Sequence, residues 1–176
     1  FTADESYTYD ALSNRTDVNH ISNNINQYTK VGAVAPTYDA NENFTNDGTN
    51  TYSYDQDNKL ISATTASKIW TYTYDALGRR TAKSDGTDTT SYLYDGDQVI
   101  AEYDTANVLS AKYIYGPGID EPISMTRGSE IYYYHFDGLG SVIGLTDSSG
   151  AKVEEYSYDI FGKADKVSLV HNPYMF

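Results

Sequence analysis

The stretch IYYYHFDGLGSVIGLTDSSGAKVEEYSYDIFG, residues 131–162, decides the fold that the sequence predicts. It begins with a tyrosine-rich strand, which runs into a glycine-containing turn at 137–140. An apolar strand follows at 141–146, and a turn at 147–150 leads to another strand and to YSYDIFG at 156–162. Short strands separated by turns that contain Asp and Gly are typical of antiparallel β-hairpins.

The same unit recurs along the chain, and its anchor is the pattern Tyr-x-Tyr-Asp. The second aromatic residue of each copy falls at positions 9, 38, 54, 74, 94, 115, 136 and 158. From position 54 onward the steps are 20, 20, 21, 21 and 22 residues, which indicates tandem repeats of one supersecondary unit. We predict a structural role within the repeat for Tyr7, Tyr9, Asp10, Tyr52, Tyr54, Asp55, Tyr72, Tyr74, Asp75, Gly78, Tyr92, Tyr94, Asp95, Tyr113, Tyr115, Gly116, Tyr134, Phe136, Asp137, Gly140, Tyr156, Tyr158, Asp159 and Gly162.

Each repeat predicts one hairpin. Side chains alternate along a strand, so both rings of Tyr-x-Tyr share one face. The Asp then starts a turn, because its carboxylate accepts hydrogen bonds from backbone N–H groups further on. A residue that tolerates positive φ follows. The residues predicted to fill that place are Asn14, Asn58, Gly78, Gly96, Gly138, Gly140 and Gly162.

The predicted fold is all-β: a curved antiparallel sheet of tandem hairpins with roughly fourteen to sixteen short strands. Residues 1–69 carry divergent repeats and residues 70–112 regular ones. Residues 13–28 have weak helical spacing but many Asn residues, which disfavour a helix interior, so we predict a loop or an irregular repeat there. The prolines and glycines of 116–122 predict a rigid turn.

The composition excludes several classes of function. The net charge of −13 argues against binding to nucleic acid or to anionic membranes, since both require Lys and Arg. The chain has no cysteine, and no apolar run approaches the ~18 residues of a membrane span. Nineteen tyrosines against five Phe and one Trp predict a half-hydrated sheet surface. Neither end of the sequence shows a pattern that would begin or end a protein, so we expect a segment of a longer protein.

The repeat aspartates have two interpretations, a ladder of carboxylates that binds cations or sugars, or a cap for the turn of each hairpin. We favour capping, because each Asp recurs at the same place in its repeat, whereas a binding site needs convergent groups. Residues 55–59 begin like a calcium loop. Leu60 and Ala66 then stand where that loop requires Gly and Glu, which argues against calcium.

No catalytic or cofactor site emerges from the sequence. His135 lies between two aromatic residues and is interpreted as a structural residue, and no other histidine stands at ligand spacing. The Gly138-Leu139-Gly140 sequence is a turn, because no helical pattern follows it. We therefore predict no catalytic residue, no metal and no cofactor.

The tyrosine rings also have two interpretations. They either stack on sugars, or they pack on one another between repeats while their hydroxyls reach water or Asp. We favour packing between repeats. The sequences Asn14-Arg15-Thr16 and Asn43-Phe44-Thr45 match glycosylation acceptors, which matter only in a eukaryotic secretory pathway.

These motifs resemble the YD repeats of Rhs proteins. The sequence at 72–80 looks like such a repeat, and residues 113–122 followed by 132–142 look like the Rhs-repeat-associated core. The segment 113–176 is thus similar to a truncated core. The chain ends before the family's self-cleavage motif and toxin domain, so the resemblance assigns neither activity to it. Relatives include bacterial polymorphic toxins, insecticidal toxin-complex subunits and the teneurins of animals.

The resemblance implies a non-enzymatic scaffold, part of a hollow β-shell that encapsulates a C-terminal toxin or effector domain. The implied partners are the rest of the parent shell and the enclosed effector, without nucleic acid or membrane insertion. A secreted or cell-surface bacterial protein is implied. Two alternatives stay open: a surface adhesin or module that binds glycans, and a repeat protein that self-associates into a ring or fibre.

Overall fold

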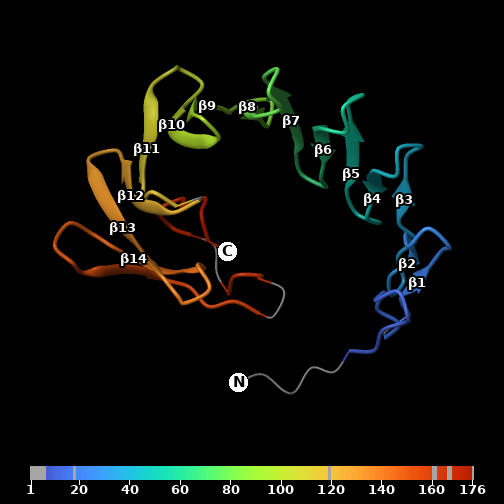
Figure 1. The fold of residues 1–176 in the computed structure, drawn as a ribbon. Helices are drawn as coiled ribbons and strands as arrows, with labels where there is room; N and C mark the ends of the chain where they lie inside the picture. The colour runs from blue at the N-terminus through green and yellow to red at the C-terminus, as the bar shows by residue number, and fades with distance from the viewer. Residues whose placement is uncertain (1–6, 18, 119, 160–161, 166–167, 176) are drawn as a thin grey trace. The chain divides into compact units, whose positions relative to one another are not determined.

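A computed structural model describes residues 7–17, 19–118, 120–159, 162–165 and 168–175 (Figure 1). These residues form fifteen β-strands and no helix, so the all-β prediction is confirmed. None of these residues forms a helix that is long and apolar enough to cross a membrane. The chain divides into two compact units: one holds Phe1–Gly78 and Lys83–Thr87, the other Arg79–Ala82 and Asp88–Phe176.

The first unit consists of antiparallel strands that pair in chain order. A hairpin of β1 and β2 occupies part of the region predicted as a loop or irregular repeat. Strand β8 (Arg80–Ser84) is divided between the two units. The strands of the first unit are β1 (Ile21–Ser22), β2 (Tyr28–Lys30), β3 (Thr37–Tyr38), β4 (Phe44–Asn46), β5 (Thr51–Tyr54), β6 (Leu60–Thr64) and β7 (Ile69–Tyr74).

The second unit follows the same plan with longer strands. Strand β12 begins at Pro122, which pairs with Tyr115, so the predicted turn ends one residue earlier than expected. Proline is tolerated at the first residue of a strand. The strands are β9 (Thr89–Asp95), β10 (Gln98–Tyr103), β11 (Leu109–Tyr115), β12 (Pro122–Arg127), β13 (Glu130–Phe136), β14 (Val142–Thr146) and β15 (Lys152–Glu155).

Most turns that follow a Tyr-x-Tyr-Asp pattern share one backbone conformation, with positive φ at the third residue after the capping Asp, whereas Gly96 takes the positive φ directly after Asp95. Gly78 has φ 84° after Asp75, and Gly140 has φ 93° after Asp137. The prediction of Asn14 at the equivalent place is wrong, because Ser13 takes the positive φ there. The prediction of Gly138 is also wrong, because the turn has its positive φ at the fourth residue, Gly140.

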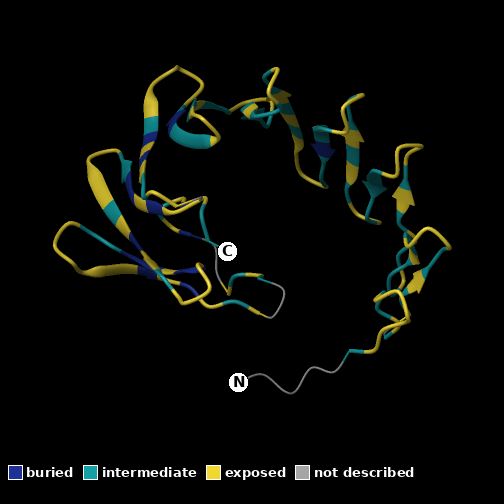
Figure 2. Cartoon of the chain, viewed as in Figure 1, coloured by how far each residue is buried: buried dark blue, intermediate teal, exposed yellow. Residues whose placement is uncertain are grey.

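Strands β5 and β7 alternate between exposed and half-buried residues, as the sequence pattern predicts, whereas β4 and β8 do not. In β7, Trp70, Tyr72 and Tyr74 are half-buried and the residues between them are exposed. Figure 2 shows that deep burial is concentrated in the second unit. Among the described residues, Ala63 is the one buried apolar residue of the first unit. The core cluster of the second unit consists of Ala111, Tyr113, Met125, Tyr134, Val142, Leu145 and Tyr156.

Candidate functional site

The repeat aspartates accept hydrogen bonds from the backbone of their own turns. Asp55 Oδ1 accepts from the N–H groups of Asp57 and Lys59, both at 2.9 Å. The same pair of bonds, to the second and fourth residues after the Asp, recurs at Asp10, Asp39, Asp104, Asp137 and Asp147. Asp95 differs, because it ends β9 and pairs with Gln98 across a shorter turn.

In the part of the chain that the structure describes, at least six tyrosine hydroxyls connect successive repeats. Each lies 2.5–3.2 Å from a main-chain carbonyl oxygen of the hairpin that precedes it. Phe136 occupies the equivalent place in its own repeat and has no hydroxyl to donate. The six residues, called the tyrosine ladder below, are Tyr38, Tyr54, Tyr74, Tyr94, Tyr115 and Tyr158.

Ladder contacts coincide with register irregularities of the hairpins. Tyr54 pairs with Leu60 where the register of β5 and β6 shifts, and the carbonyl of Leu60 accepts from Tyr74 of the next repeat. Likewise, Val99 pairs with Tyr94 and accepts from Tyr115. A bulge locally disrupts the main-chain ladder. In these two hairpins, a hydroxyl from the next repeat therefore satisfies a carbonyl beside the register shift.

The prediction that tyrosine hydroxyls reach water or Asp is wrong for the six ladder tyrosines, whose hydroxyls lie against main-chain carbonyls. Tyr52 agrees with the prediction, because its hydroxyl donates to Asp47 at 2.7 Å. The ladder tyrosines donate to main-chain carbonyls instead. The hydrogen bond from Tyr52 is also the main reason why the pKa of Asp47 lies well below its usual range. The correct partners lie on another hairpin, so the sequence of one repeat does not reveal them.

Cationic and amide side chains add further contacts between repeats. Arg79 donates to the carbonyl of Gly96, and its guanidinium lies 4.9 Å from the centre of the Tyr94 ring. Asn43 Nδ2 donates to Asp39 at 3.0 Å and to Asn58 at 2.8 Å. The amide nitrogen that a glycan would modify in the Asn43 sequon is thus occupied by the fold.

The remaining sequence candidates lie apart from one another. His135 lies 3.0 Å from the Thr146 hydroxyl, on the exposed side of β13. In the calcium-like loop, Asp57 pairs with Lys59 at 3.0 Å. Among the described residues, no three His, Cys, Asp or Glu side chains are grouped as a metal ion would require.

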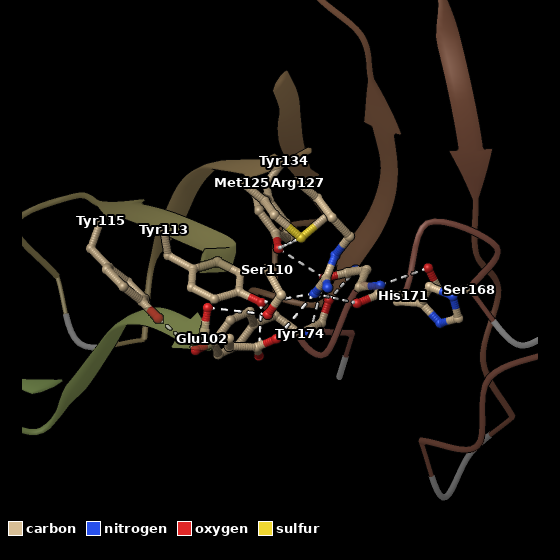
Figure 3. Close-up of polar contacts among 11 residues, drawn as sticks. Glu102, Ser110, Tyr113, Tyr115, Met125, Arg127, Tyr134, Ser168, His171 and Tyr174 are labelled. Atoms are coloured by element: carbon tan, nitrogen blue, oxygen red, sulfur yellow. Dashed lines mark hydrogen bonds and ion pairs between the residues drawn. The ribbon is translucent and has the colours of Figure 1, made fainter. Parts of the chain in front are cut away.

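A buried polar cluster lies inside the second unit (Figure 3). The Glu102 carboxylate accepts from the Tyr113 hydroxyl at 3.0 Å and from Arg127 Nη2 at 3.2 Å. Arg127 Nη2 also lies 3.2 Å from the carbonyl of His171. Its Nε atom is buried without a partner among the described residues. This cluster is a partly buried ion pair that faces a chain segment, an arrangement suited to holding that segment in place.

Residues 168–175, called the C-terminal segment below, lie against this cluster. Glu154 is a buried residue, with 4% of its surface exposed. Its carboxylate accepts hydrogen bonds from the Ser168 hydroxyl at 2.8 Å and from the N–H groups of Leu169 and Val170. Tyr134 donates to Asn172 Oδ1 at 2.8 Å. The segment therefore satisfies groups of the sheet that are removed from water.

The ring of Tyr174 is the aromatic centre of the same region. It packs edge-to-face on Tyr113 with a centroid distance of 5.2 Å, and its hydroxyl lies 2.6 Å from that of Tyr115. Burial raises the pKa of Tyr113, Tyr134 and Tyr174 above the ordinary value of 10.0. These tyrosines are neutral near pH 7 and act as hydrogen-bonding core residues rather than as nucleophiles.

Sequence reasoning missed Glu102, Arg127, Glu154 and the C-terminal segment. Each glutamate lies on the same face as the core in a strand, a place that normally carries an apolar residue. A glutamate at a core-facing strand position is a signal that can be found in the sequence. It does not reveal which distant residues form hydrogen bonds with that glutamate.

Comparisons with known proteins support the repeat interpretation. The family model described as "Teneurin YD-shell" matches residues 2–173. The chain is 35% identical over 176 residues to the tRNA3(Ser)-specific nuclease WapA of Bacillus spizizenii, covering 91% of the chain and 8% of that protein. The tRNA nuclease WapA of Bacillus subtilis strain 168 gives the same identity and the same coverage. The chain thus spans less than a tenth of the length of these relatives.

Among solved structures, the Photorhabdus luminescens Tc holotoxin pore matches 90% of the chain and 10% of its own chain. The TM-score is 0.61 and the sequence identity 16%, so the likeness concerns the fold. The predicted resemblance to YD-repeat proteins is confirmed by the family match over nearly the whole chain. The chain belongs to the teneurin YD-shell family.

Proposed function

We propose that this chain is a non-enzymatic wall segment of a YD-repeat shell that encloses a C-terminal toxin or effector domain of its parent protein. The observation that carries the proposal is the family match, which extends over residues 2–173. The fold likeness to the Tc holotoxin pore supports a shell architecture.

The contacts between repeats are of the kind that a shell built from tandem repeats requires. Repeat arrays bury surface only against their neighbours, so each interface must be specified locally. Here each ladder tyrosine connects its own hairpin to the preceding one through a hydroxyl and a carbonyl. Because main-chain carbonyls occur in every strand, the same contact can be repeated along the chain without requiring a special side chain as acceptor.

The absence of enzymatic activity is part of the proposal. The two curated relatives are named as tRNA nucleases, but the chain covers 8% of each of them. A net charge of −13 disfavours binding to tRNA. Incubation of the purified chain with total tRNA should leave the tRNA intact on a denaturing gel. A tRNA-cleaving activity that copurifies with the chain would contradict this part of the proposal.

The enclosed domain can be tested in the parent protein with a protease of defined specificity. One recognition site is inserted in the domain that follows the repeats, and a control site in the 137–140 turn, where Leu139 is 94% exposed. Enclosure predicts rapid cleavage in the turn and cleavage of the following domain only after the shell is denatured. Equal rates at the two sites in the folded protein would refute enclosure.

The setting that we propose is secreted or at the surface of a bacterial cell, with the rest of the parent shell as partner. Binding to glycans and self-association are alternatives. Glycan binding would use exposed rings, and of the nineteen tyrosines only Tyr9 and Tyr133 are exposed. This observation favours the scaffold over the sugar-binding module.

A further inference from the structure

We propose that the C-terminal segment, residues 168–175, is a latch that opens as one unit while the sheet of the second unit stays folded. This inference does not depend on the enclosure of an effector domain. It concerns how the segment is attached and what its release uncovers.

The segment is attached to the sheet at both of its ends. At one end, Glu154 accepts hydrogen bonds from Ser168, Leu169 and Val170. At the other end, the carbonyl of Met175 accepts from the N–H of Val142, in β14, at 2.7 Å. These contacts make the exchange of the Val142 amide a reporter for the far end of the segment.

The segment is also hydrogen-bonded within itself. The Asn172 N–H donates to the Ser168 hydroxyl at 2.8 Å, and Asn172 Oδ1 accepts from the Tyr174 N–H at 3.0 Å. Because Asn172 is bonded to residues on both sides of it, displacement of one end disturbs the other. The eight residues therefore behave as a single body rather than as a fraying tail.

The sheet beneath has its own support. Strands β12, β13 and β14 are joined by antiparallel main-chain pairing, with one register shift between His135 and Phe136, whereas the segment forms no strand among the described residues. Its attachment depends mainly on side chains, namely Glu154, Tyr134 and Arg127. Proteins open locally in cooperative units, and elements with few main-chain bonds to the rest open first.

Opening would uncover a specific surface. The Tyr174 ring covers Tyr113, which is 2% exposed, and packs near Tyr134, which is 7% exposed. Release of the segment would expose the rings of Tyr113 and Tyr134. It would also remove the three hydrogen-bond donors of the Glu154 carboxylate. An open latch thus has a hydrogen-bonding surface that accepts the same segment again, which makes the opening reversible.

Amide-resolved hydrogen exchange of the full chain tests the proposal with Glu154→Gln. Loss of a charge-assisted acceptor should accelerate exchange at Leu169 and Val170 by about tenfold or more. A latch predicts the same factor at the Val142 amide, with no change in β12 and β13. The matched control is Glu155→Gln, since Glu155 is the exposed neighbour that pairs with Lys152. It should leave all these amides unchanged.

A second variant keeps the test valid if Glu154→Gln disturbs the sheet. Ser168→Ala removes a hydroxyl of the segment alone, and it should accelerate the same three amides together. Acceleration at Leu169 and Val170 without Val142 would mean that the segment frays from one end, which overturns the latch. Joint acceleration of the β12 and β13 amides would mean that the whole unit unfolds, and unchanged exchange everywhere would mean that Glu154 does not hold the segment. Both results also overturn the proposal.

Discussion

At the scale of single residues, the hydroxyl of each ladder tyrosine forms a hydrogen bond between two repeats. Tyr54→Phe removes the hydroxyl that donates to the Phe44 carbonyl at 2.9 Å and leaves the ring in place. The free energy of unfolding should fall by about 0.5–1.5 kcal/mol, because the carbonyl loses its partner. Denaturant titration measures the change, and Tyr9→Phe, at a tyrosine that is 56% exposed, should change little. Equal effects of the two variants would contradict a role for the ladder.

The aspartates make a second prediction at this scale, which distinguishes capping from cation binding. Asp55→Ala removes the acceptor of two backbone N–H groups and should destabilise the first unit by about 1 kcal/mol. Asp55→Asn keeps one acceptor oxygen, so its stability should lie close to that of the wild type. A calcium ligand would behave differently: calcium would raise the melting temperature of the wild type, and Asp55→Asn would abolish that increase.

At the scale of elements, the buried tyrosines of the second unit predict an alkaline transition. Burial raises the pKa of Tyr92 to about 12 and shifts the pKa of Tyr113 and Tyr134 in the same direction. The folded state thus retains these protons above pH 10, where the unfolded chain releases them. The stabilisation is complete below pH 10 and is lost as the pH rises towards 12 and beyond.

Absorbance at 295 nm, which reports tyrosinate, should therefore rise in step with the loss of near-ultraviolet circular dichroism above pH 10. Tyr92→Phe is the informative variant, because it removes one raised pKa and should flatten the fall of stability with pH. Ionisation of all the tyrosines near pH 10 with the circular dichroism unchanged would contradict the burial of these hydroxyls.

The elements also show what the sequence can predict and what it cannot. Strand β10 begins and ends at the residues that the pattern predicts, Gln98 and Tyr103, because alternation and turn residues are local signals. The acceptor of the Tyr74 hydroxyl was not predictable, since it depends on the register shift at Tyr54 in another hairpin. The C-terminal segment was missed for a related reason. It has no periodicity, and its partners are 14 or more residues away in the chain.

At the scale of the whole molecule, the two units differ in how much apolar surface they bury. The second has a core cluster, whereas among the described residues Ala63 is the buried apolar side chain of the first. Hydrophobic stabilisation scales with buried apolar area, and repeat arrays need not unfold in one step. We therefore expect the first unit to unfold at a lower denaturant concentration than the second.

The single tryptophan makes this difference measurable. Trp70 lies in β7 of the first unit, whereas the buried tyrosines that dominate the near-ultraviolet circular dichroism lie in the second. In a urea titration the Trp70 emission should change first, and the tyrosine circular dichroism should follow at a higher urea concentration. Met125→Ala, a cavity in the core cluster, should lower the second midpoint and leave the first unchanged, because Met125 is fully buried in the second unit. Coincident transitions that both shift with Met125→Ala would instead show that the two units unfold as one cooperative structure.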